Sequence, residues 1–280
     1  MPILLPLVYL VSQPIVLNVH GTDIIRVIDN RAIRSLSRIV LTRINLLIVP
    51  TVYFKDLVLE HFPEMKPEII YVSPSGGINR QLFKRTSLSQ KVSSVLVLGF
   101  VSRFIEEKGW RIFLDALKRL ANDNLSFKGV MVGKGPDEND MKEYIKALKL
   151  NEHIDLIGFV PQDELPNIYN DLDIYIFPTY REAESLGLTG LEAMSCGVPV
   201  IGSMIAGPAT YIRDGYNGFT FPPKNSEALS NKIKAYAELS REERESFSTR
   251  AEQTAKNYDQ QYVAKNLLER LKESLTNSLK

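Results

Sequence analysis

The chain has too few cysteine and histidine residues for two common kinds of site. Cys196 is its only cysteine, so an internal disulfide framework is excluded, and we expect a reducing compartment. The three histidines, His20, His61 and His153, lie far apart and show no spacing typical of metal ligands. We therefore expect neither a bound metal nor a cofactor.

The chain also lacks an excess of charge of either sign. It has 34 Lys plus Arg against 33 Asp plus Glu, which gives a net charge of +1. The basic residues are dispersed, and aromatic residues do not alternate with them. A nucleic-acid partner is therefore not expected.

The apolar start, "MPILLPLVYLVSQPIVLNV", lacks the features of a targeting or membrane-spanning segment. It has no basic n-region and no small-residue cleavage site. Pro2, Pro6 and Pro14 interrupt it, whereas a spanning helix needs about 20 apolar residues in succession. We predict a buried helix followed by a buried strand at "PIVLNV". Because chains rarely begin inside a core, we expect that part of the first domain is missing upstream.

What the sequence does contain is a long alternation of strand-like and helical segments. The hydrophobic fraction is 44%, enough for a sizeable core in a chain of 280 residues. The strand-like runs are "IVLNV", "LLIVP", "IIYVSP", "SVLVLGF", "FKGVMVG", "HIDLIGF", "LDIYIFP" and "VPVIGS". Amphipathic stretches such as "GWRIFLDALKRLAND" lie between the later runs. The pattern predicts an α/β fold of two Rossmann-like domains with parallel sheets.

A polar break at residues 83–94 separates the two predicted domains and is expected to be a linker. We place a partial N-terminal domain at residues 1–88 and a complete second domain at 89–257. Residues 258–280 form a predicted amphipathic helix, which we expect to pack back toward the first domain.

Ligands of parallel α/β sheets bind at the carboxyl ends of the strands, so the loops there are candidate sites. Arg103 and Lys108 follow one strand and could bind an anionic phosphate at a helix entrance, or could be ordinary surface charges. Gly133 and Gly135 follow the next strand and allow a close backbone approach or simply a turn.

A third loop follows the strand-like run "HIDLIGF". Phe159 and Val160 lie in it and could border a ligand, although most such loops only turn. Asp163 is expected to cap the next helix.

Glu184 and Glu192 flank the run "SLGLTGL" in the last candidate loop. If a helix begins near Leu186–Leu188, its free N–H groups attract a phosphate, and the two carboxylates accept hydrogen bonds from sugar hydroxyls. The alternative is a capping Glu184 and a solvent-facing Glu192. The apolar neighbours of Glu192 disfavour an exposed position, so we interpret the pair as a nucleotide-sugar site.

"ESLGLTGLE" resembles the E-x(7)-E motif of retaining glycosyltransferase family 4, which has the GT-B fold. "RFIEEKG" resembles the phosphate loop of that family, and "VGKGPDENDMKEYIKALKLNEHIDLIGFVPQDELPNIYNDLDIYIFPTYREA" follows its donor domain in order. "NVHGTD" and "GPATYIRDGYNGFTFPP" also resemble family segments. Thr210 stands where an acidic residue is often found.

The resemblance implies the role of each candidate residue. Glu184 and His20 would be catalytic and face the transferred sugar, Arg103 and Lys108 would bind the donor diphosphate, and Glu192 would bind the ribose. The remaining donor contacts implied are Gly133, Gly135, Phe159, Val160, Leu186, Gly187 and Leu188.

The implied activity is transfer of a sugar, with retention, from a nucleotide-diphosphate sugar to a glycan or lipid-linked acceptor in surface polysaccharide synthesis. The nucleotide sugar is a substrate and not a cofactor. The expected location is the cytoplasm, with peripheral contact at the inner face of the membrane or with a partner chain that supplies the missing N-terminal part. The alternatives are a nucleotide-sugar-binding subunit without catalysis of its own and a nucleotide-sugar epimerase, and the E-x(7)-E context disfavours the epimerase.

Overall fold

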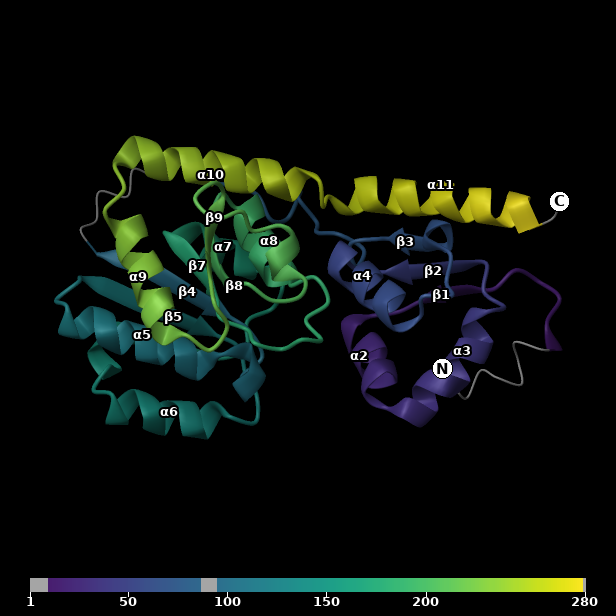
Figure 1. The fold of residues 1–280 in the computed structure, drawn as a ribbon. Coiled ribbons are helices and arrows are strands. Elements are labelled where there is room, and N and C mark those ends of the chain that lie inside the picture. The colour runs from purple at the N-terminus through teal and green to yellow at the C-terminus, as the bar shows by residue number, and fades with distance from the viewer. Residues whose placement is uncertain (1–9, 87–94, 279–280) are drawn as a thin grey trace. The chain divides into compact units, whose positions relative to one another are not determined.

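The computed structural model describes residues 10–86 and 95–278 and divides into two compact units (Figure 1). The first unit comprises Met1–Gly77, Glu182–Leu186 and Gln260–Lys280. The second comprises Ile78–Arg181 and Gly187–Asp259. The domain limits inferred from the sequence stay predictions.

The first unit contains a parallel sheet of three described strands in the order β1-β2-β3. Its strands are β1 Val16–Asn18, β2 Leu46–Val49 and β3 Ile70–Val72. All four residues of β2 are buried, as expected for a central strand with helices on the sheet. The expected buried strand at "PIVLNV" is only half-buried, because no described strand pairs with the outer edge of β1. The expected helix before it falls mainly on residues 1–9, outside the described residues.

Each α-helix of the first unit buries residues on one face, whereas its 3-10 helix buries none. They are α2 Gly21–Asp29, α3 Arg31–Leu41, α4 Val52–His61, the 3-10 helix η2 Pro67–Ile69 and α11 Gln260–Ser278. In α2, Ile24 and Val27 are three positions apart and both enter the core. Across the described part of the chain, no helix has both the length and the apolar character that a membrane crossing needs.

The second unit is built on a parallel sheet with the strand order β6-β5-β4-β7-β8-β9. Its strands are β4 Leu96–Val101, β5 Phe127–Val132, β6 Ile154–Ile157, β7 Ile174–Phe177, β8 Val200–Ser203 and β9 Gly218–Phe221. This is the order of a doubly wound Rossmann-like sheet, and its switch point lies between β4 and β7. The expected α/β class with parallel sheets is confirmed.

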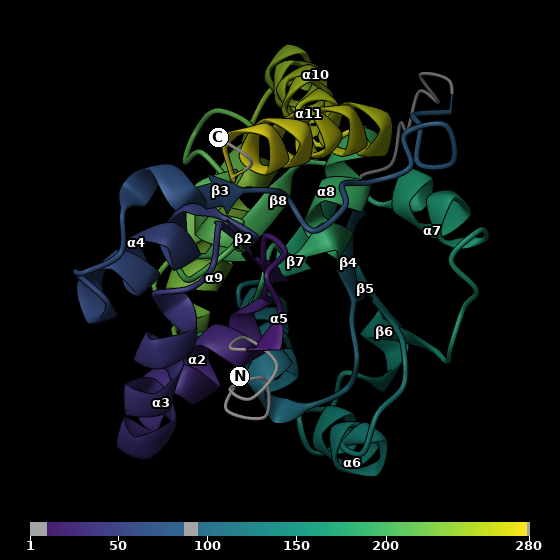
Figure 2. The same ribbon diagram turned by 90° about the vertical axis from the view of Figure 1, so that its right-hand side faces the viewer.

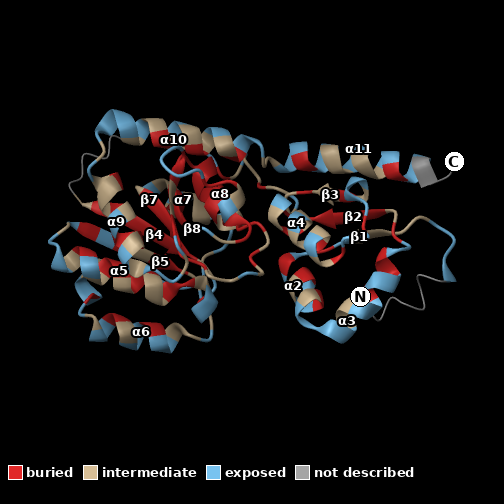
Figure 3. Ribbon diagram, in the orientation of Figure 1, coloured by how far each residue is buried: buried red, intermediate tan, exposed pale blue. Residues whose placement is uncertain are grey.

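Helices cover both faces of this sheet (Figures 1 and 2). On one face α5 packs against α6 and α9, and on the other α8 packs against α7 and α10. The helical segments are η3 Glu106–Lys108, α5 Trp110–Asn122, α6 Glu138–Ala147, η4 Asn151–His153, α7 Leu165–Asp171, α8 Leu188–Ser195, η5 Pro208–Thr210, α9 Ser226–Ala237 and α10 Arg241–Lys256. Figure 3 shows that burial concentrates in the strands and in α8, while α5, α9 and α10 expose their outer faces.

Part of the expected linker packs on the second unit, and one expected helix cap is wrong. Residues 83–86 of the expected linker are packed on the second unit, where Phe83 is 1% exposed and its ring centroid lies 6.0 Å from that of Tyr169. Arg85 donates to both carboxylate oxygens of Glu245, at 2.8 and 2.7 Å. The cap expected at Asp163 is wrong, because α7 begins at Leu165 and Glu164 occupies its N-cap position.

Candidate functional site

A cavity of about 770 Å³ opens at the carboxyl ends of β4, β5 and β6 in the second unit. Cavities of this size suit small-molecule ligands, and the edge of the sheet is the one where such folds bind them. Five expected donor contacts line it: Arg103, Gly133, Gly135, Phe159 and Val160. The other lining residues are Val101, Ser102, Val132, Lys134, Glu138, Leu165 and Thr189.

Two glycines allow the loops after β4 and β5 to pack against each other along this cavity. Gly133 has a φ of +140°, a backbone conformation that side chains disfavour. A Cβ at Gly133 would overlap the carbonyl oxygen of Ser102, and one at Gly135 would overlap that of Phe104. The Phe104 N–H donates to the carbonyl of Lys134 at 3.0 Å. Close packing of the two loops therefore accounts for both glycines and forms one wall of the cavity.

Two cations and one aromatic ring lie on the cavity wall. The ammonium of Lys134 is 4.7 Å from the ring centroid of Phe159, whose side chain is 66% exposed. The carboxylate of Glu138 accepts from Lys142 at 2.6 Å. Within the described residues, no carboxylate is paired with the guanidinium of Arg103. That guanidinium is therefore available to an anionic ligand.

The helix α8 begins at Leu188, as the sequence predicts, and directs its first N–H groups toward the carboxyl edge of the sheet. Gly187 occupies the N-cap position with a φ of +79°. A Cβ there would lie 2.5 Å from Cε1 of Phe177, so the turn requires glycine. Thr189, in the first turn, lines the cavity. The first N–H groups of a helix lack partners within it and favour a negative ligand.

Glu192 is a buried carboxylate on this helix. It is 5% exposed, so the solvent-facing interpretation is wrong. The Tyr169 hydroxyl donates to Oε2 at 3.0 Å, and Gln162 Nε2 donates to Oε1 at 3.2 Å. Burial raises the pKa of Glu192, and the two hydrogen bonds act in the opposite direction. Glu192 follows Thr189 by three positions on α8, so the two residues share a helix face, and Thr189 lines the cavity.

Lys108 is the last residue of η3. Its ammonium is 6.0 Å from the ring centroid of Phe177, which belongs to β7. The described lining includes Arg103 but not Lys108. The phosphate-binding role of Lys108 stays a prediction.

The two expected catalytic residues, His20 and Glu184, both belong to the first unit. In that unit the Gly21 N–H donates to Oγ of Ser185 at 2.9 Å. His20 directly precedes Gly21, and Glu184 directly precedes Ser185, so this bond joins the two segments that carry them. His20 precedes α2, and its backbone N–H donates to Asp23 at 3.0 Å. Glu184 is 9% exposed. Leu186, also expected at the donor, is buried in the same unit.

Sequence reasoning missed four residues that contribute to the site. Lys134 and Thr189 line the cavity, while Tyr169 and Gln162 hold Glu192. Thr189 could have been found from its spacing, because it shares a helix face with Glu192. The bonds to Glu192 come from α7 and from the loop before it, and no local pattern indicates them.

In residues 10–86 and 95–278, no three His, Cys, Asp or Glu side chains gather in a way that could hold a metal ion. Independence from metals and cofactors stays a prediction.

Comparisons with known proteins agree with this geometry. Residues 86–254, more than half of the chain, match the family model of glycosyl transferases group 1. The putative colanic acid biosynthesis glycosyltransferase WcaL of Salmonella typhimurium is 26% identical over 206 residues, which cover 72% of this chain and 50% of that protein. The 2-deoxystreptamine glucosyltransferase of Streptomyces kanamyceticus is 35% identical over 127 residues, covering 45% of this chain and 32% of that protein. The chain thus spans about half the length, or less, of these curated relatives.

A solved structure supports the fold over almost the whole chain. HepE of Anabaena, crystallised in complex with UDP, superposes with a TM-score of 0.81 at 21% identity, covering 97% of this chain and 76% of that one. The same protein was also crystallised with UDP-glucose. The structural neighbours share the GT-B fold expected from the sequence. The chain belongs to the glycosyl transferases group 1.

Proposed function

We propose that this glycosyltransferase moves a sugar from a nucleotide-diphosphate sugar to a glycan or lipid-linked acceptor in the synthesis of a surface polysaccharide. The observation that carries the proposal is the buried Glu192, held by two hydrogen bonds beside a cavity that Arg103 lines. A carboxylate suits ribose hydroxyls and a free guanidinium suits a diphosphate. The similarity to a colanic acid glycosyltransferase supports the polysaccharide pathway.

The proposed reaction breaks the bond between the anomeric carbon and the diphosphate oxygen. The nucleoside diphosphate leaves with the electron pair, the acceptor oxygen bonds to the anomeric carbon, and the acceptor proton passes to the leaving phosphate. Arg103 and the first N–H groups of α8 would stabilise the charge on that phosphate. One preorganised donor of this kind is typically worth about 3 kcal/mol at the transition state.

The finer assignments are part of the same proposal. We infer that the base of the donor nucleotide is uracil, because HepE was crystallised with UDP and with UDP-glucose. Glu184 and His20 would contact the transferred sugar, and retention would follow if the acceptor attacks from the side of the leaving group. The family resemblance supports both inferences.

A second candidate function is binding of the donor without transfer. The observation that favours it is the division of the expected site residues: the residues that line the cavity lie in the second unit, whereas His20 and Glu184 belong to the first. In that case the chain binds a nucleotide sugar and needs a partner chain for transfer.

Turnover separates the two functions. The full chain is incubated with UDP-glucose and a bacterial glycolipid extract, and release of UDP and labelled lipid is measured. We expect transfer by the wild type and losses of about 100-fold or more in Arg103→Gln, because an electrostatic donor to the leaving group is removed. Arg111→Gln is the matched control: its guanidinium pairs with Glu106 at 2.9 Å and is absent from the described cavity lining.

Two outcomes of the turnover assay would go against the first proposal. Binding of UDP-glucose without transfer would select the second candidate. Transfer that survives Arg103→Gln unchanged would contradict the assigned site.

A further inference from the structure

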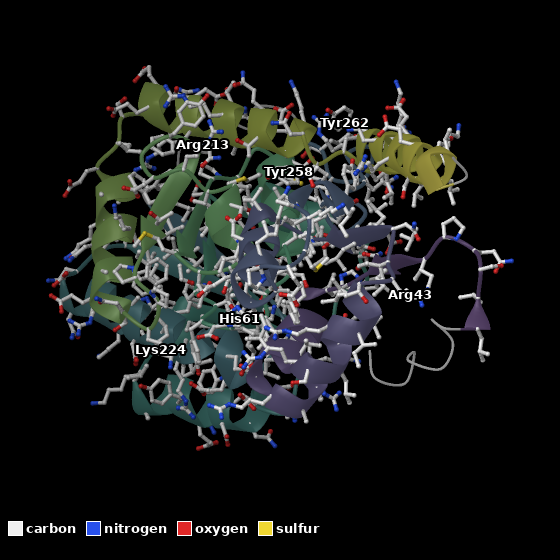
Figure 4. The ribbon with its side chains drawn as sticks, turned by 45° about the vertical axis from the view of Figure 1, so that its right-hand side comes forward. Arg43, His61, Arg213, Lys224, Tyr258 and Tyr262 are labelled. Atoms are coloured by element: carbon white, nitrogen blue, oxygen red, sulfur yellow. The ribbon has the colours of Figure 1, made fainter. Side chains whose placement is uncertain are left out.

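A second, smaller cavity of the second unit lies between α10 and the loop that joins β8 to β9. Its volume is about 170 Å³. The lining residues are Thr210, Tyr211, Arg213, Tyr216, Arg250, Gln253, Thr254, Asn257 and Tyr258. Arg213 and Tyr258 are labelled in Figure 4, below the ribbon of α10. None of these residues lines the cavity at the carboxyl ends of β4, β5 and β6.

The charge of this second cavity is unbalanced. Two guanidiniums line it, those of Arg213 and Arg250, and its described lining contains no carboxylate. The neighbouring acids have partners elsewhere: both oxygens of Asp214 lie 3.0 Å from the ammonium of Lys232, and Glu252 lies 3.8 Å from Arg80. The two cations therefore remain available to an anion.

The walls of the cavity are fixed by a buried side chain. Asn217 is 0% exposed, and its side chain makes three hydrogen bonds. Its Oδ1 accepts from the Arg213 N–H at 2.7 Å, and its Nδ2 donates to the carbonyl of Tyr211 and to Oγ1 of Thr254, each at 2.9 Å. The amide thus ties the loop to α10. A site held in this way loses little conformational entropy when a ligand binds.

Other donors surround the two arginines. The Arg250 guanidinium lies 4.8 Å from the ring centroid of Tyr216, which orients it. The hydroxyl of Tyr258, whose pKa is raised further by burial, is protonated at neutral pH and can donate. Gln253 adds a side-chain amide from α10, and Asn257 adds one from the C-cap of that helix.

We propose that this cavity binds a phosphate group. The volume equals that of between five and six liquid waters at about 30 Å³ each, which accommodates a phosphate and part of its hydration. The planar guanidinium of an arginine can donate two hydrogen bonds at once to a phosphate, and the amide and hydroxyl groups of the cavity add further donors. The phosphate is either a free anion or the headgroup of a lipid.

Calorimetric titration with inorganic phosphate tests the proposal. It is done on the full chain carrying Arg103→Ala, which weakens anion binding in the larger cavity. We expect saturable binding that the additional double change Arg213→Gln and Arg250→Gln weakens by at least about tenfold, because the loss of even one charge-assisted hydrogen bond has about that effect. The additional change Arg241→Gln, at the start of the same helix and absent from the cavity lining, should leave the affinity unchanged.

Co-sedimentation with vesicles that contain phosphatidic acid distinguishes the two sources. Binding of phosphate in solution assigns a free anion. Vesicle binding that the double variant loses, without binding of free phosphate, assigns a lipid headgroup. The proposal would be overturned if the double variant bound phosphate and vesicles with unchanged affinity. It would also be overturned if the protein bound neither.

Discussion

Burial and hydrogen bonding act in opposite directions on the carboxyl group of Glu192. Burial dominates and raises its pKa, while Tyr169 and Gln162 favour the charged form. Because the folded-state pKa is raised, this group contributes most to stability below its unfolded-state pKa. That contribution is lost as the pH rises through the folded-state pKa. A buried carboxyl group with a raised pKa is typical of a binding site.

Replacing Tyr169 with Phe tests the hydrogen bond that holds this carboxylate. The change removes the donor at 3.0 Å, so the pKa of Glu192 should rise further and more of the carboxyl should be neutral near pH 7. We expect nucleotide-sugar affinity to fall by about tenfold at neutral pH, in line with the loss of a hydrogen bond to a charged group. We also expect the pH midpoint of binding to shift upward. Calorimetry across a pH series measures both.

Tyr144→Phe is the matched control for this experiment. Its hydroxyl also donates to a carboxylate, that of Asp115 at 2.6 Å, and neither residue is in the described cavity lining. The affinity and its pH midpoint should not change in this variant. An identical response of the two variants would show that Tyr169 acts only through stability.

At the scale of elements, the loops after β4 and β5 form the cavity wall because two glycines let them touch. Gly133→Ala adds a Cβ that overlaps the Ser102 carbonyl and imposes a strained φ of +140°. We expect a loss of more than about 2 kcal/mol in the free energy of unfolding. The midpoint of urea denaturation measures it.

Gly158→Ala is the matched control on the neighbouring loop. A Cβ there meets no atom within 4 Å, and the position has no positive φ. Its unfolding free energy should stay within about 0.5 kcal/mol of the wild type. Equal midpoints for the two variants would contradict the packing account.

Periodic apolar runs were enough to predict most strands and the start of α8. The strand β9 was missed, because "GFTF" is short and has only two large apolar residues next to a turn. The packing of residues 83–86 was also missed. Phe83 is a single apolar residue in a polar run, and it is buried only because Tyr169 lies next to it in the folded unit.

At the scale of the whole molecule, the predicted site residues divide between the two units. Arg103, Gly133, Gly135, Phe159 and Val160 line one cavity of the second unit, as the rule about carboxyl ends of strands predicts. His20 and Glu184 belong to the first unit. The sequence indicated which loops matter. It could not indicate Tyr169 or Gln162, since contacts between distant segments depend on how helices pack on the sheet.

The central claim is that the cavity of the second unit binds a nucleotide sugar through Arg103 and Glu192. The most direct test is a thermal-shift panel with UDP-, GDP- and ADP-sugars on the wild type, Arg103→Ala and Glu192→Ala. A ligand at about 100 times its dissociation constant should add about 2.7 kcal/mol of stability. We predict a raised melting temperature for the wild type with a UDP-sugar and none for either variant. Equal shifts in all three proteins, or no shift with any nucleotide sugar, would contradict the claim.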